Sequence, residues 1–331
     1  MRVLSRYVAS ANDAGPKAKV DVERILKDEY NAKIYTYRMK SQNNTCFEKI
    51  KKVLFGVSHC SKKDITLIQF PFLNLKWLYK NNKKIFVIIH DIGYFRTMDK
   101  KLLEKEIAIL NMCQGVIVHN KSMQQFLIDH GLAIPTVILE FFDYLCDNNE
   151  VVSKMQKSVE IIYPGNWSKS KAEFLYQLEE RKMKFNINVY GPNTDNDKLI
   201  NEKISFKGSF KPDELIYNIN GNVGLVWSGK LDESDANVGD KFYNLYNTPH
   251  KLSCFLAANI PVIVWEKSAI ADVVKKYNIG YTISNIYDIN NIDFSNYDEV
   301  AKNVAKLGKK IRNGYFTKRA ISKALKIIDK K

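Results

Sequence analysis

Short apolar runs alternate with segments of helical spacing along the whole chain. Uninterrupted apolar runs bounded by turn residues are typical of strands in a parallel sheet that helices cover on both faces. The predicted strands are residues 1–8, 33–37, 65–70, 84–90 and 115–119 in the first half, and residues 161–163, 186–190, 204–206, 223–227, 262–264 and 280–283 in the second. We therefore predict an α/β protein with two Rossmann-like, doubly wound domains that face a ligand-binding cleft.

A polar stretch without period, residues 147–158, separates the two sets of strands and predicts a linker. The predicted domains are accordingly residues 1–150 and 159–316. Between the strands we expect helices, among them residues 73–80 and residues 168–182. The polar segment 228–247 is long for a connection within a compact domain, which favours a functional loop.

One predicted helix, near residues 248–259, has an unusual first turn. Thr248 is a good N-cap, Pro249 suits the first helical position, and Asn259 can adopt the left-handed conformation that ends a helix. His250 and Lys251 lie in the first turn, where a cation opposes the helix dipole by about 0.3–1 kcal/mol. Free backbone N–H groups beside a lysine suit a bound anion such as a phosphate, although a solvated surface lysine is the alternative interpretation.

Composition limits the class of protein and of partner. The 331 residues carry a net charge of +15, which favours anionic partners: nucleotides, nucleic acid or an anionic membrane surface. The five cysteines are scattered without CxxC spacing, as expected for reduced thiols in the cytoplasm. No apolar run approaches the roughly 20 residues of a membrane span, and the N-terminus lacks the apolar region of a signal peptide. We expect a cytoplasmic protein that at most contacts the inner face of the membrane.

Two strand ends carry candidate chemistry. The turn after residues 1–8 is small and polar, as close approach of a ligand requires, but it lacks the GxGxxG fingerprint, which disfavours a dehydrogenase. His90 and Asp91 follow residues 84–89, and this pair could supply a general base or orient a sugar hydroxyl. The alternative is a histidine that only caps neighbouring backbone at the strand end.

The second half contains a recognisable run, NTPHKLSCFLAANIPVIV at residues 247–264. It resembles the nucleotide-sugar signature of GT-B glycosyltransferases and, more narrowly, the bacterial hexosyltransferases that extend O-linked N-acetylglucosamine on serine-rich repeat adhesins. Further matches follow in the same order: MRV at residues 1–3, IHD at 89–91, PGN at 164–166, PDE at 212–214, GLVW at 224–227 and GYFT at 314–317. Galactofuranosyltransferases of capsule and exopolysaccharide synthesis share much of this pattern.

The resemblance implies a GT-B fold in which the second domain binds a UDP-sugar, the first presents the acceptor, and the last helix, residues 317–331, packs back on the first domain. Lys251 would neutralise the diphosphate. Lys169 and Phe210 stand where the family has arginine and tyrosine, so the hydrogen bonds of those side chains differ here. The donor-binding residues implied are Ser10, Ala11, Gly165, Asn166, Lys169, Tyr190, Phe210, His250, Lys251 and Ser253.

The resemblance also implies an inverting enzyme, which needs one base for the acceptor hydroxyl. We assign this role to Asp91 or His90 from their place at a strand end. Asp195-Asn196-Asp197 is formally a DxD metal motif. GT-B enzymes use helix dipoles and basic side chains instead, so we expect no metal and no cofactor beyond the UDP-sugar.

The predicted activity is transfer of a hexose, with glucose expected, from a UDP-sugar to N-acetylglucosamine on Ser or Thr of an adhesin. A galactofuranosyltransferase that uses UDP-galactofuranose is one alternative, and a non-catalytic adaptor of a glycosyltransferase complex is another. A nucleic-acid-binding protein is disfavoured because the basic residues are dispersed. The segment from residue 302 onward contains eleven basic residues and one acidic residue. This composition is typical of a solvated helix face, and the alternative is contact with acidic lipid headgroups. The resemblance also implies a homo-oligomer, a tetramer or dimer.

Overall fold

The protein was analysed as a computed structural model. The structure describes residues 1–8, 16–39, 50–51, 54–55, 58–59, 63–72, 84–147, 153–155, 158–196, 198–231 and 240–329. These residues form two compact units, one that runs to Asp143 and resumes at Gly314, and one from Tyr144 to Asn313. The predicted helix at residues 73–80 and most of the predicted linker lie outside the described residues.

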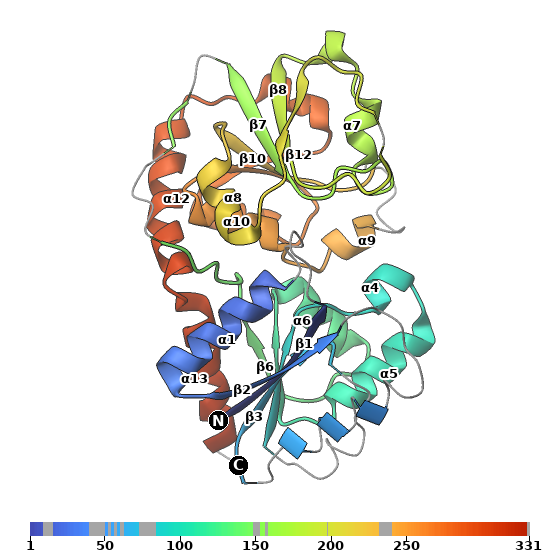
Figure 1. Cartoon of the computed structure of the whole chain (residues 1–331), viewed down its shortest axis with the longest axis vertical. Coiled ribbons are helices and arrows are strands. Elements are labelled where there is room, and N and C mark those ends of the chain that lie inside the picture. The colour runs from blue at the N-terminus through green and yellow to red at the C-terminus, as the bar shows by residue number, and fades with distance from the viewer. Residues whose placement is uncertain are drawn as a thin grey trace. The chain divides into compact units, whose positions relative to one another are not determined.

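The first unit is built on a parallel six-stranded sheet of order β2-β1-β3-β4-β5-β6 (Figure 1). Its elements are β1 (Arg2–Val8), α1 (Lys17–Tyr30), β2 (Lys33–Met39), β3 (Thr66–Phe70), β4 (Ile85–Ile89), α4 (Tyr94–Thr97), α5 (Lys100–Leu110), β5 (Gly115–Val118), α6 (Lys121–Asp129), β6 (Thr136–Ile138) and α13 (Tyr315–Asp329). The strands β3, β4 and β5 are buried along their whole length, as their uninterrupted apolar sequences predict. The order of the sheet changes direction between β1 and β3, which is where doubly wound sheets bind ligands.

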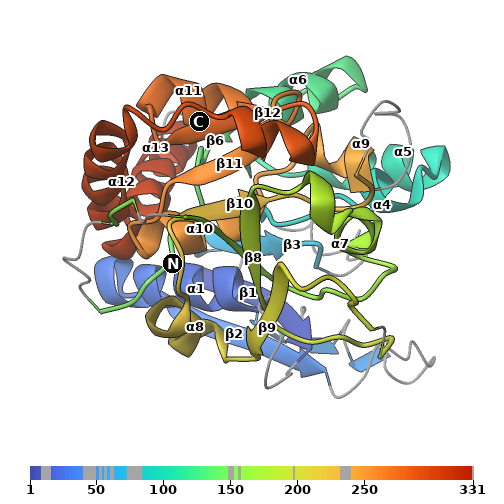
Figure 2. The same ribbon diagram turned by 90° about the horizontal axis from the view of Figure 1, so that it is seen from above.

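The C-terminal helix α13 belongs to this first unit, where it packs against α1 and beside β5 and β6 (Figures 1 and 2). Its first backbone N–H groups, of Phe316 and Thr317, donate to the buried carboxylate of Asp143 at 3.2 and 2.6 Å. The Tyr30 hydroxyl donates to the carbonyl of Lys318 at 3.0 Å. The apolar face of the helix and its first turn are therefore both satisfied within this unit.

The second unit repeats the architecture with the order β12-β11-β10-β7-β8-β9, again all parallel. Its elements are β7 (Val159–Pro164), α7 (Glu173–Gln177), η1 (Glu180–Lys182), β8 (Phe185–Tyr190), β9 (Ile204–Gly208), α8 (Pro212–Asn218), β10 (Val223–Val226), α9 (Asp240–Asn244), α10 (His250–Ala257), β11 (Val262–Trp265), α11 (Ala271–Tyr277), β12 (Gly280–Ile283), η2 (Ile286–Asn291) and α12 (Tyr297–Arg312). The change of direction falls between β7 and β10, and α10 packs on β10 and β11 and against α12 (Figure 2).

The two parallel sheets confirm the predicted α/β class, and every predicted strand is present. The predicted helix at residues 168–182 is wrong, because only α7 and the short η1 form there. Ser168 and Ser170 are the candidate caps of such a helix, but the Ser168 hydroxyl instead accepts the backbone N–H groups of Thr194 and Asp195 at 2.7 and 3.2 Å. Among the helices that the structure describes, none has both the length and the apolar character needed to cross a membrane.

Candidate active site

Two glycines shape the carboxyl end of the second sheet. Gly165 follows β7 with a φ of +136°, and Gly191 follows β8 with a φ of +112°, a region that favours glycine. The Gly165 N–H donates to the carbonyl of Tyr190 at 2.8 Å. A Cβ on Gly191 would lie 2.5 Å from the carbonyl oxygen of Gly165, so the two turns pack backbone against backbone.

Lys251 lies against this glycine turn. Its Nζ sits 4.1 Å from the centroid of the Tyr163 ring, a cation–π geometry. A Cβ on Gly165 would lie 3.0 Å from Cε and 3.1 Å from Nζ of the same lysine. The glycine therefore leaves the space that the lysine side chain occupies at the end of β7.

The N-terminus of α10 adds positive potential at this place. Pro249 is its N-cap, one residue later than predicted, and the described residues provide neither a capping side chain nor an acidic residue in the first turn. The ring of His250 stacks on Tyr144 at 5.0 Å, and the Tyr144 hydroxyl donates to the carbonyl of Pro212. Asn259, with a φ of 59°, ends the helix region in the left-handed conformation that was predicted. A lysine, a histidine and the positive end of the helix dipole therefore lie together here, a combination that favours a bound anion.

The aromatic pair near the glycines has one buried and one accessible member. Tyr190 is 1% exposed, and its hydroxyl accepts the backbone N–H of Asn220 at 2.8 Å. Phe210 is half-buried, with its ring 6.3 Å from that of Tyr190 and within 3.1 Å of a Cβ built on Gly208. Phe210 can therefore contact a flat ligand, whereas Tyr190 supports it from the core.

The remaining sequence-predicted donor residues have other surroundings. The Asn166 side chain is used within its own loop: its Oδ1 accepts from the Ser168 N–H and hydroxyl at 3.0 and 2.6 Å, and its Nδ2 donates to Thr194 at 3.0 Å. Lys169 is exposed, and Ser253 is fully buried in α10. Ser10 and Ala11 lie outside the described residues.

The first aspartate of the DxD sequence is hydrogen-bonded within its own surroundings. The carboxylate of Asp195 accepts the hydroxyl of Ser170 at 2.5 Å, a hydrogen bond that lowers its pKa. Asp197 lies outside the described residues. Within the part of the chain that the structure describes, no group of three or more His, Cys, Asp or Glu side chains could hold a metal ion.

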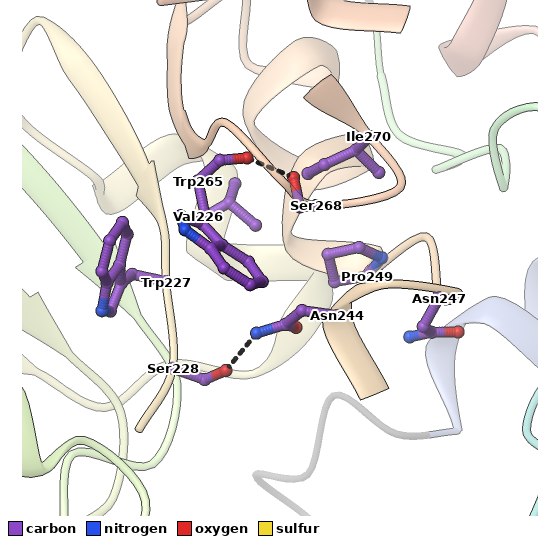
Figure 3. A pocket seen from close by; sticks show the side chains of 9 residues that line it. All are labelled: Val226, Trp227, Ser228, Asn244, Asn247, Pro249, Trp265, Ser268 and Ile270. Carbon is purple, nitrogen blue, oxygen red and sulfur yellow. Dashed lines mark hydrogen bonds between the residues drawn. The ribbon is translucent and has the colours of Figure 1, made fainter. Parts of the chain in front are cut away.

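A pocket opens beside the N-terminus of α10, at the ends of β10 and β11 (Figure 3). Its empty space is about 290 Å³ including the open mouth, and it is lined by Val226, Trp227, Ser228, Asn244, Asn247, Pro249, Trp265, Ser268 and Ile270. The Asn244 amide donates to the Ser228 hydroxyl at 2.9 Å. Asn247 is 4% exposed, and its Oδ1 has no hydrogen-bond partner among the described residues. The lining combines two tryptophan rings with a few amides and hydroxyls, and most of the empty space lies at the open mouth.

In the first unit, His90 and Asp91 lie directly beyond the end of β4. The Nε2 atom of His90 is 2.7 Å from Oε1 of Gln69, and the imidazole stacks on Phe142 at 4.9 Å. Asp91 accepts the Arg96 guanidinium at 2.6 Å through Oδ2, while its Oδ1 is buried without a partner among the described residues. Burial raises the pKa of Asp91, and the nearby Arg96 opposes that rise.

Lys19 is a charged neighbour of this pair that sequence reasoning missed. Its Nζ donates to the carbonyl of Arg6 at 2.8 Å. Burial, with the positive charge of Arg6, lowers the pKa of Lys19 to about 8, against the opposing effects of Asp91 and Glu23. A single lysine at the start of α1 carries no sequence signal for this role, because only the fold brings it near Asp91.

Two sequence models of known protein domains match most of this chain. The sequence model described as "Glucosyltransferase 3-like, N-terminal domain" matches residues 1–141, and the one described as "Glucosyltransferase 3-like, C-terminal domain" matches residues 161–324. The chain belongs to the glucosyltransferase 3-like family. This membership confirms the resemblance inferred from residues 247–264 and identifies the protein as a glycosyltransferase.

Relatives of this glucosyltransferase 3-like protein differ in their named sugar. It is 28% identical over 335 residues to the β-1,6-galactofuranosyltransferase WbbI of Escherichia coli K12, with 96% of each chain covered. It is 26% identical over 314 residues to glucosyltransferase 3 of Streptococcus parasanguinis, with 88% of this chain and 87% of the relative covered.

Solved structures agree on the fold. Anabaena HepE in complex with UDP matches with a TM-score of 0.61 at 10% identity and 100% coverage of both chains. Sucrose-phosphate synthase from Thermosynechococcus elongatus matches with a TM-score of 0.60 at 12% identity, with 99% of this chain and 98% of that chain covered. The predicted GT-B fold is therefore confirmed.

Proposed function

We propose that this protein is an inverting hexosyltransferase that binds the UDP moiety of its donor at the N-terminus of α10. The observation that carries the proposal is the position of Lys251, in the first turn of that helix and against the glycine turn at the end of β7. A diphosphate there would meet an ammonium group and several backbone N–H groups together. HepE, which shares the fold, was solved in complex with UDP, which supports a uridine nucleotide as the ligand.

The rest of the donor lies on either side of the diphosphate in this proposal. Phe210, the accessible aromatic ring near Gly208, would contact the uracil. Pro249 caps α10 and also lines the pocket of Figure 3, so a hexose joined to the diphosphate would lie beside Trp227, Asn244 and Asn247. Loss of either amide should change the choice of sugar more than the affinity for UDP.

The base that accepts the proton of the acceptor hydroxyl is His90 rather than Asp91 in this proposal. One carboxylate oxygen of Asp91 is paired with Arg96 and the other is buried, so neither is presented to a substrate. The half-buried imidazole of His90 is held by stacking and by a hydrogen bond, as a general base requires. Asp91 then contributes negative charge close to the reaction.

UDP-glucose is the proposed donor, and the proposed acceptor is N-acetylglucosamine on Ser or Thr of an adhesin, in keeping with the relatives named glucosyltransferase 3. The second candidate is UDP-galactofuranose, which the 28% identity to WbbI over 96% of both chains favours. Turnover measured with both donors against the same acceptor separates the two.

Calorimetric titration with UDP tests the donor site. A hydrogen bond to a charged group contributes about 1.5–3 kcal/mol, so Lys251→Ala should weaken UDP binding by about 10- to 150-fold. Lys276→Ala is the matched control, because Lys276 also lies over a tyrosine ring, 4.6 Å from that of Tyr277, but on α11. Equal UDP affinity in wild type and Lys251→Ala would reject the site. An absence of UDP binding by the wild type would favour the adaptor alternative.

A further inference from the structure

A buried glutamine interrupts the apolar interior of the first sheet. Gln69 stands in β3, whose sequence TLIQF is buried at every position, and the glutamine itself is 0% exposed. A buried amide without hydrogen bonds costs about 1–3 kcal/mol on the scale of protein mutational data, so its retention needs a compensating network. Gln69 has such a network, and it leads to His90.

The network fixes the orientation of the glutamine amide. Nε2 of Gln69 donates to the carbonyl of Lys19 at 3.2 Å and approaches Oε1 of Glu23 at 3.5 Å. Glu23 also accepts the hydroxyls of Ser5 and Thr36. With the amide reversed, an oxygen would face both the carbonyl and the carboxylate, and that arrangement is repulsive.

The amide orientation in turn fixes the tautomer of the histidine. Oε1 of Gln69 can only accept, so Nε2 of His90, 2.7 Å away, must carry a proton and donate it. In the neutral imidazole Nδ1 is then the nitrogen with the lone pair. Stacking on Phe142 at 4.9 Å and 22° fixes the plane of the ring, which Gln69 alone would leave free to tilt.

We infer that Gln69 is a positioning residue for catalysis, which holds His90 in the Nε2–H tautomer so that Nδ1 serves as the base. This inference rests on the proposed role of His90. In the transfer step the acceptor oxygen forms a bond to C1 of the hexose, and the C1–O bond to the diphosphate breaks with its electron pair leaving on UDP. The proton of the acceptor hydroxyl goes to Nδ1, and the resulting imidazolium keeps its hydrogen bond to Gln69.

Several charged and titratable groups interact with the neighbours of this histidine, or with one another close to them. They are Arg6 on β1, Lys19 and Glu23 on α1, Asp91 and Arg96 after β4, Glu106 on α5, and His119, whose ring meets the other edge of the Phe142 contact. Substitution of Gln69 leaves the identity of all these groups unchanged, but it also removes the donor to the Lys19 carbonyl and Glu23.

Nitrogen-15 NMR of the histidine side chains in the full chain reads the tautomer directly. His90 is one of five histidines, and a His90→Gln variant assigns its signals. The wild type is expected in the Nε2–H form. Gln69→Leu should yield a mixture of tautomers and lower the pKa of His90, because the acceptor that stabilises the Nε2 proton is lost. Gln124→Leu, which removes a glutamine bonded to Thr136 in the same unit, should leave the His90 signals unchanged.

The pH dependence of kcat/KM separates this inference from the proposed role of His90. If both hold, the acidic limb of the profile moves to lower pH in Gln69→Leu by the same amount as the measured pKa of His90. If the NMR signals respond but the profile does not move, Gln69 orients His90 but His90 is not the base. If Gln69→Leu leaves the tautomer as in the wild type, the inference about Gln69 is overturned whatever the activity.

Discussion

The variant Gly165→Ala should distinguish an effect on UDP binding from an effect on the stability of the fold. Gly165→Ala places a Cβ 3.0 Å from Cε and 3.1 Å from Nζ of Lys251, closer than ordinary van der Waals contact. The lysine side chain is flexible and will move, so the ammonium leaves its position over Tyr163 at little cost in packing. The φ of +136° adds about 1–3 kcal/mol of backbone strain for alanine.

Gly131→Ala is the control for that strain. Gly131 has a φ of +98°, but no described atom lies within 4 Å of the Cβ that alanine would add, and it follows α6 in the first unit. Both variants should unfold at a lower temperature than the wild type. Only Gly165→Ala should also weaken UDP binding, by about tenfold, which corresponds to about 1.4 kcal/mol.

Calorimetry with UDP on both folded variants, and on the double variant Gly165→Ala/Lys251→Ala, tests the reasoning. If the methyl group acts by displacing the lysine, the double variant binds UDP no more weakly than Lys251→Ala alone. Wild-type UDP affinity in a folded Gly165→Ala protein would refute the assignment of this turn to the donor site. Additive losses in the double variant would show that the glycine acts independently of Lys251.

Three further outcomes are expected. His90→Gln should lower kcat about 100-fold and Asp91→Asn by about tenfold or less, with UDP affinity unchanged in calorimetry; the opposite order would assign the base to Asp91. Burial raises the pKa of Asp143 from 3.8 to about 7, so the folded protein binds the extra proton and the free energy of unfolding should fall as pH rises from about 4 to 7. Denaturant melts of Asp143→Asn should lack that component, which is on the order of 4 kcal/mol, whereas parallel pH curves for both proteins would contradict it. Activity should survive EDTA, and a loss that manganese restores would instead implicate the loop that contains Asp195.

The sheets and the helix ends were largely predictable from the sequence, because strand burial and left-handed residues depend on local pattern. Uninterrupted runs such as residues 85–89 indicated a fully buried strand, and Asn259 indicated where α10 ends. The predicted helix at residues 168–182 failed for a non-local reason. Ser168 finds its partners in Thr194 and Asp195, which are more than twenty residues away.

The candidate site was predictable only in part. Lys251 was found because a cation in the first turn of a helix is locally unfavourable, so the sequence itself posed the question. Lys19 and the partner of His90 were missed, since their roles depend on contacts between α1, β3 and β4. One signal was available for Gln69, a lone polar residue near the end of an apolar strand that precedes the strand ending at His90.

Topology places different polar side chains at the strand ends of two similar sheets. In the second unit the strand order reverses between β7 and β10, and the glycine turn after β7 leaves room there for Lys251. In the first unit the reversal falls between β1 and β3, and Gln69 lies near the end of β3. At such a reversal the connections leave toward opposite faces of the sheet, so the strand ends are open to polar partners that an unbroken helical layer would exclude. Gln69 contacts His90, which follows the neighbouring strand β4, across this position. The proposed positioning of His90 accounts for a polar residue in an otherwise apolar buried strand.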